Sequence, residues 1–129
     1  MALTMDTVAE HIKPLTGAIT RRYTCGSTIV AGTPVTMMAD GFVDPSDASD
    51  ATLSFVAGIA VQGGVVGDRV DVVVFGPIIC VTGMTIGALV YLSDTVGEMS
   101  QTAGTKTTII GWAESAAVIF VNIKYVSLS

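Results

Sequence analysis

Short apolar runs separated by glycine-led turns fill the stretch from Gly87 to Lys124. Leu89 to Leu92, Thr107 to Ile110 and Val118 to Ile123 are each too short for a helix, and β-branched residues are frequent in them. Strict alternation of apolar and polar residues is absent, but this composition suits buried strands. The stretch therefore predicts a series of hairpins.

The same order of signals occurs earlier in the chain. Each series starts with a short segment around a glycine, continues to a turn glycine and a three-residue landmark, and ends in an apolar run. The pairs are Ala31-Gly-Thr-Pro-Val and Ile86-Gly-Ala-Leu-Val, Gly41 and Gly97, Gly58-Ile-Ala and Gly111-Trp-Ala, and Val70–Phe75 and Val118–Ile123. Landmarks that keep their order and nearly their separation favour an internal duplication over chance spacing of a frequent residue.

These patterns predict an all-β fold, a small partly closed barrel or sandwich of short strands built from two similar halves. Residues 1–22 differ from the rest, because they contain a single glycine and a cluster of charged residues. We expect residues 1–22 to form an extended N-terminal arm and residues 23–129 to form the β-domain. The apolar side chains of the arm have no place in a core that begins after it, so we expect them to contact a neighbour: Val8, Ile12, Leu15 and Ile19, with Arg21 and Arg22 beside them.

The composition of the chain limits the kinds of partner that it can bind. Half of the residues are hydrophobic and only 13% are charged, so we expect a homo-oligomer that covers its apolar surface. The net charge of -5 opposes binding to a nucleic-acid backbone, and Arg21-Arg22 is too small a patch for a membrane surface. Trp112 is expected to anchor either the core or a subunit contact, and the sequence does not separate these roles.

The uncharged run from Val72 to Leu92 is long enough to cross a bilayer, but Gly76-Pro77 and two further glycines interrupt it. Pro77 cannot donate to a helix ladder, so buried strands are expected instead. No signal peptide is visible at the N-terminus, which favours assembly in the cytoplasm. In that reducing compartment, Cys25 and Cys80 are expected to be small buried hydrophobic residues with free thiols.

Few residues in the sequence are spaced as catalytic or metal-binding groups would be. Asp44, Asp47 and Asp50 lack the ligand spacing of a calcium-binding EF-hand, so a solvated loop is expected, with a loose cation contact as the alternative. His11 has no second ligand at zinc spacing. Glu98 and Glu114 would resemble a glycosidase pair, but nothing in the sequence fixes their separation. We therefore expect no enzyme, no metal and no cofactor.

Five segments carry a resemblance to a known family. The motifs Gly87-x-x-Val-Tyr-Leu-Ser, Gly97-x-Met-Ser-x-Thr-Ala-Gly-Thr and Ile110-Gly-Trp-Ala-x-Ser-Ala resemble the C-terminal half of capsid decoration (cement) proteins of tailed bacteriophages. Ala31-Gly-Thr-Pro-Val and Gly67-Asp-Arg-Val-Asp-Val-Val-Val are similar to the first half of the same family. The resemblance covers about residues 24 to 125, and its motifs are turn and strand patterns.

The resemblance implies a structural protein on the outer surface of a virion, made and assembled in the host cytoplasm. Such proteins commonly form trimers on the head and clamp neighbouring capsomers, so the implied partners are the major capsid protein and further copies of the chain. The expected contact residues are Val8, Ile12, Leu15, Ile19, Arg21, Arg22 and Trp112. The alternative is a carbohydrate-binding or adhesion module of the tail or head, which would need exposed aromatic residues on one face.

Overall fold

The computed structural model describes residues 4–5 and 12–125, and every regular element in this part of the chain is a β-strand. No helix that could span a membrane occurs among the described residues. The strands, in chain order, are β1 Thr4–Met5, β2 Lys13–Pro14, β3 Ile19–Thr24, β4 Pro34–Met37, β5 Val43–Pro45, β6 Gly58–Ala60, β7 Arg69–Ile79, β8 Val81–Thr82, β9 Leu89–Leu92, β10 Met99–Ser100, β11 Thr108–Ala113 and β12 Val118–Tyr125.

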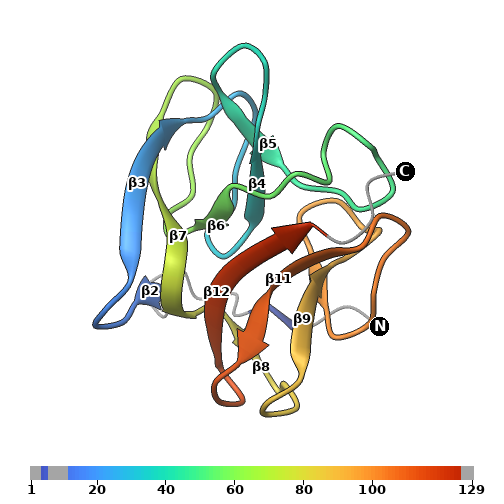
Figure 1. Cartoon of the computed structure of the whole chain (residues 1–129). Helices are drawn as coiled ribbons and strands as arrows, with labels where there is room; N and C mark the ends of the chain where they lie inside the picture. The colour runs from blue at the N-terminus through green and yellow to red at the C-terminus, as the bar shows by residue number, and fades with distance from the viewer. Residues whose placement is uncertain (1–3, 6–11, 126–129) are drawn as a thin grey trace.

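Ten of the strands form one curled antiparallel sheet, which bends into a half-barrel (Figure 1), and β1 and β8 form a separate two-stranded sheet. The sheet order is β10-β9-β11-β12-β7-β6-β4-β5, while β2 and β3 pair with the other edge of β7 and β1 pairs with β8. This architecture confirms the predicted all-β fold. β7 is the longest strand and holds the sheet together, because it pairs with four other strands along its two edges.

The two predicted halves have the same topology. The first half runs β5-β4-β6-β7 and the second runs β10-β9-β11-β12, and the two last strands, β7 and β12, pair antiparallel at the centre. Backbone hydrogen bonds repeat as well. In the first half Gly32 N donates to Ala60 O (2.7 Å) and Ala60 N to Thr33 O (2.9 Å); in the second Gly87 N donates to Ala113 O (2.8 Å) and Ala113 N to Ala88 O (3.0 Å).

Asp40-Gly41 is a dipeptide typical of a type I′ hairpin turn, and the structure has a hairpin here, but its turn is not type I′. Met38 N donates to Phe42 O (2.8 Å) and Gly41 N donates to Met38 O (2.9 Å), which closes a three-residue loop. Within this loop only Gly41 has a positive φ, +86°, as in a type I turn followed by a left-handed residue. A single glycine therefore suffices where two left-handed residues were expected.

Two clusters of buried side chains fill the interior. The larger contains residues of both halves, among them Ile59, Val73, Val90 and Ile119, and the smaller lies within the first half. Cys80 belongs to the larger cluster and Cys25 to the smaller. Both cysteines are buried and are not joined to each other, as the sequence predicted.

The chain pairs with β7 on both sides of the expected boundary between an arm and the β-domain. Residues 19–24 form β3 and pair with β7, with a register shift between Ile19 and Thr20, so the predicted boundary after residue 22 falls inside β3. Ile12 is only 4% exposed and belongs to the larger core cluster. The outer edge of β7 would otherwise be unpaired, and residues 13–24 of this same chain supply its partner.

Candidate interaction surface

Five apolar side chains form a row across the exposed face of the sheet, which we call the apolar stripe. Cross-strand partners share a face, and the register places Leu89 of β9 opposite Trp112 of β11 and Trp112 opposite Phe120 of β12. The stripe continues into β7 through the ring contact of Phe75 with Phe120, and into β3 through Ile19, the register partner of Phe75. Its members, in spatial order, are Leu89, Trp112, Phe120, Phe75 and Ile19.

Aromatic contacts hold the centre of the stripe together. Trp112 stacks on Phe120 with ring centroids 5.5 Å apart, and Phe75 meets Phe120 edge to face at 5.3 Å. Both geometries are favourable for aromatic pairs. Even so, Trp112 is 40% exposed, Phe75 41% and Ile19 54%. The sheet therefore presents a preformed apolar surface to its surroundings.

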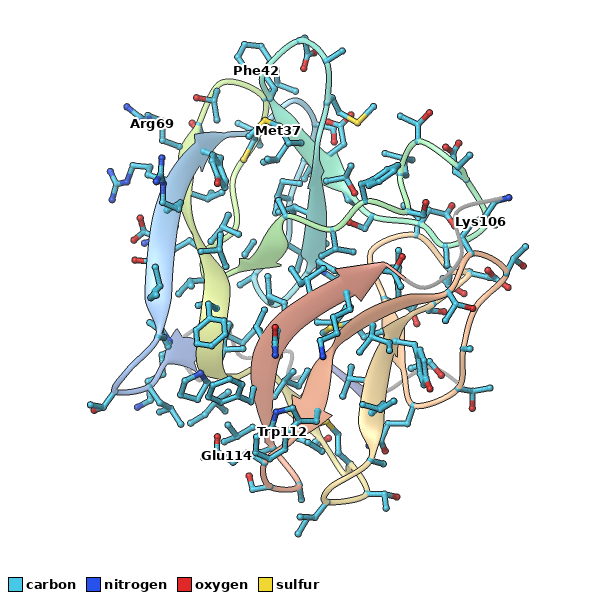
Figure 2. All side chains as sticks on the ribbon, viewed as in Figure 1. Met37, Phe42, Arg69, Lys106, Trp112 and Glu114 are labelled. Carbon is cyan, nitrogen blue, oxygen red and sulfur yellow. The ribbon has the colours of Figure 1, made fainter. Side chains whose placement is uncertain are left out.

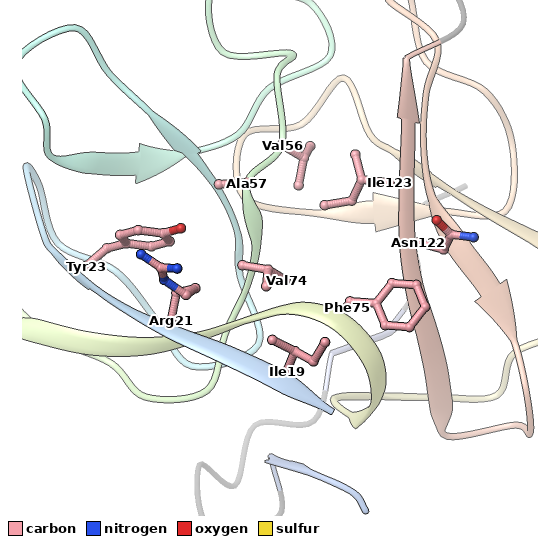
Figure 3. Close-up of a pocket in the computed structure, with 9 residues that line it drawn as sticks. All are labelled: Ile19, Arg21, Tyr23, Val56, Ala57, Val74, Phe75, Asn122 and Ile123. Carbon is pink, nitrogen blue, oxygen red and sulfur yellow. The ribbon is translucent and has the colours of Figure 1, made fainter. Parts of the chain in front are cut away.

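An open groove of about 600 Å³ adjoins the Phe75 end of the stripe (Figure 3). Ile19, Arg21 and Tyr23 of β3 point toward it from one side, while Asn122 and Ile123 of β12 lie on the other. Val56 and Ala57, before β6, close one end. The groove forms because β6 pairs with β7 at Val72 and Val73, whereas β12 pairs with it only from Gly76 onward.

Charge is divided between the two faces of the β3–β7 ribbon. On the groove side, Arg21 has no ion pair with a described residue, and Lys124 is exposed on the same face of β12 as Asn122. On the opposite side, Arg22 Nε lies 3.1 Å from Asp71 Oδ1, and Arg69 is the neighbour of Thr24. The groove thus carries a positive charge in a chain whose net charge is -5.

The structure separates the predicted contact residues. Ile19, Arg21 and Trp112 lie on the exposed stripe or in the groove, as a contact surface requires. Ile12 faces the core, and Leu15 is half-buried in the turn after β2, where its N–H donates to Pro77 O (3.0 Å). Arg22 points away from the groove, toward Asp71, and Val8 lies outside the described residues.

Sequence reasoning missed Leu89, Phe75 and Phe120. For Phe120 a signal was present, because Asn122 and Lys124 follow it at a spacing of two and strands alternate their faces. Two polar residues on that face mark it as exposed, so Phe120 had to lie there too. Phe75 offered no comparable signal, since the strand that ends at this residue is almost entirely apolar.

The carboxylates of the 44–50 loop cap turns. Asp47 Oδ1 accepts hydrogen bonds from Ser49 N (2.8 Å) and Ser49 Oγ (2.6 Å), and Asp50 Oδ1 accepts from Thr52 N (2.8 Å). No group of three or more His, Cys, Asp or Glu among the described residues is placed to hold a metal ion.

The other candidate residues for chemistry do not come together. Glu98 and Glu114 lie at opposite ends of β9, because Glu98 O accepts from Ser93 N at one end while Glu114 follows Ala113, which binds Gly87 N at the other. His11 is outside the described residues. Burial raises the pKa of Cys80 from 9.0 to about 12, and burial with a smaller effect of Asp68 raises that of Cys25, which disfavours the nucleophilic thiolate form of both.

No model of a known protein family matches the chain, and no curated protein matches it.

Proposed function

We propose that the chain is a structural decoration protein, which binds the outside of a phage head and stabilises contacts between capsomers. The observation that carries the proposal is the apolar stripe, together with the resemblance of residues 24–125 to capsid decoration proteins. The chain acts by burying apolar surface against other subunits, and in this proposal it catalyses no reaction.

The internal repeat supports a functional role for the apolar stripe. Ile59 stands in the first half where Trp112 stands in the second, within the landmarks Gly58-Ile-Ala and Gly111-Trp-Ala. Ile59 is fully buried, whereas Trp112 is 40% exposed and stacks on the half-buried Phe120. The shared topology therefore does not require an exposed tryptophan. Tryptophan is enriched at the energetic centres of protein interfaces.

Binding to purified heads tests the proposal. Heads lacking the protein would be mixed with the wild-type chain or with the Trp112→Ser variant, and co-sedimentation would give the affinity. We expect the wild type to bind and the substitution to weaken binding by about thirtyfold or more, the effect of losing an interface hot spot. Val66→Ser, which changes an exposed apolar residue outside the stripe, is the matched control and should bind normally. No binding of the wild type to heads would contradict the proposal.

A carbohydrate-binding module is the second candidate, because Trp112 and Phe75 are exposed on one face of the sheet and both contact the half-buried Phe120. The chain has one tryptophan, so its fluorescence reports directly on this face. Titration with host polysaccharides that shifts the emission, together with a location on tails or fibres in virion images, would favour this candidate over decoration.

A further inference from the structure

Two exposed apolar surfaces of this chain differ in charge. The first is the groove, where Ile19, Val74 and Phe75 supply apolar walls and Arg21 supplies a cation. Lys124 adds a second positive charge on the same face of β12. A buried partner for this surface needs apolar side chains and at least one carboxylate, because a desolvated cation is costly unless it is paired.

The second surface is the β4–β5 hairpin tip, residues 37–42. Met37 and Phe42 are each 41% exposed there, although both are large apolar side chains. Asp40 lies between them, and its Oδ1 accepts a hydrogen bond from Phe42 N (2.9 Å), which fixes the carboxylate at the tip. The hairpin tip therefore combines the two features that the groove requires of a partner: exposed apolar side chains and a negative charge held in place.

The residues of the hairpin tip are not part of the groove lining. Met37 and Phe42 lie at one end of the molecule and Trp112 of the stripe lies at the other (Figure 2). Two copies that paired groove to groove would place Arg21 and Lys124 against the same residues of the other copy, and like charges in a desolvated contact repel. The charges favour a contact between unlike surfaces of two copies.

We propose that the hairpin tip of one copy docks into the groove of a second copy, with Asp40 paired to Arg21. This contact rests on the proposed function, because it requires a layer of copies on a phage head. It joins neighbouring copies within that layer. A head-to-tail contact of this kind leaves the groove of one copy and the tip of the other free, so further copies can add, and the assembly closes into a ring when the rotation per copy allows.

Sedimentation velocity of the free full-length protein tests the contact. We expect the wild type to self-associate, and Arg21→Glu and Asp40→Lys each to lower the association constant by about tenfold or more, as for close charge pairs at interfaces. The double variant Arg21→Glu/Asp40→Lys restores the pair with reversed sign, so its association should return to near the wild-type value. Asp40→Asn keeps a side-chain oxygen that can accept from Phe42 N but removes the charge. It therefore separates the loss of the ion pair with Arg21 from a loss of turn stability.

The matched control is Arg69→Glu, which makes the same charge change on the face of the β3–β7 ribbon that points away from the groove. It should associate like the wild type. A monomeric wild type, an unrestored double variant, or an equal effect of Arg69→Glu would each overturn the proposed contact. Those results concern the free protein, whereas failure of the wild type to bind heads would overturn the proposed function instead.

Discussion

Gly58 and Gly111 occupy the same position in the two halves of the chain, and each lies against the backbone of the half's last strand. A Cβ on Gly58 would overlap Val73 O, and a Cβ on Gly111 would overlap Phe120 O. Each glycine also has an equivalent partner on its other side, since Gly58 pairs with Val35 of β4 and Gly111 pairs with Val90 of β9. The repeated glycine thus marks a close approach of two backbones, which only a residue without a side chain permits.

Replacing either glycine by alanine should destabilise the protein strongly. The added methyl group meets backbone atoms, which cannot move without disturbing the sheet, so we expect Gly58→Ala and Gly111→Ala each to lower the free energy of unfolding by about 3 kcal/mol. Urea unfolding followed by circular dichroism measures the loss. Gly83→Ala is the control, because open space surrounds that glycine and only its positive φ of +74° opposes alanine, at a cost of about 1 kcal/mol. Equal losses at all three sites would contradict the close approach.

Ile12 and Ile19 should have separable roles, although the sequence grouped them. Ile12 is buried in the core and Ile19 is mostly exposed on the stripe. Ile12→Ala should lower the free energy of unfolding by about 2–4 kcal/mol, the usual cost of such a core cavity. Ile19→Ala should cost less than about 1 kcal/mol but weaken binding to heads. Thermal unfolding and co-sedimentation measure the two effects, and the reverse assignment would refute the separation.

Removal of residues 1–22 should destabilise the β-domain. The deletion takes away Ile12, β2 and most of β3, and it leaves one edge of β7 without a partner. We expect a lower unfolding temperature or aggregation of the truncated chain, checked by calorimetry. Unchanged thermal unfolding would show instead that these residues are a detachable arm, as the composition of the segment first indicated.

Stability should fall above pH 9 because of Cys80. The folded state holds this thiol protonated up to a pKa of about 12, whereas the unfolded thiol ionises from 9.0. Between these values the folded state binds more protons, so the free energy of unfolding drops by about 1.4 kcal/mol per pH unit, while below pH 9 the contribution is constant. Urea unfolding at pH 8, 9 and 10 should show a steeper drop for the wild type than for Cys80→Ala. Parallel pH profiles would contradict this origin.

The repeated turn glycines and short apolar runs were sufficient to predict the fold class and the duplicated topology. Turn chemistry and strand composition are local properties, so the β4–β5 hairpin and the paired landmarks Gly58-Ile-Ala and Gly111-Trp-Ala follow from nearby residues. The place of β3 did not follow, because its partner β7 lies far away in sequence and the charged Arg21-Arg22 pair resembles a solvated segment. A charged strand at a sheet edge has the same composition as an arm.

The candidate surface was only partly predictable for a related reason. Trp112 and Ile19 were expected at contacts, but their connection depends on Phe75 and Phe120, which the pairing of β7 with β12 brings together. That pairing joins the two halves and has no local signature. The exposure of Trp112 also depended on which face of β11 is covered, and a sequence run with little alternation does not specify this.

The measurement that tests the proposed decoration function most directly is a cryo-electron microscopy reconstruction of heads mixed with the purified protein. We expect copies of the β-domain to be distributed over the outer surface of the head, with Trp112, Phe120 and Phe75 facing neighbouring subunits. Heads without added density, or bound copies whose apolar stripe faces solvent, would contradict it.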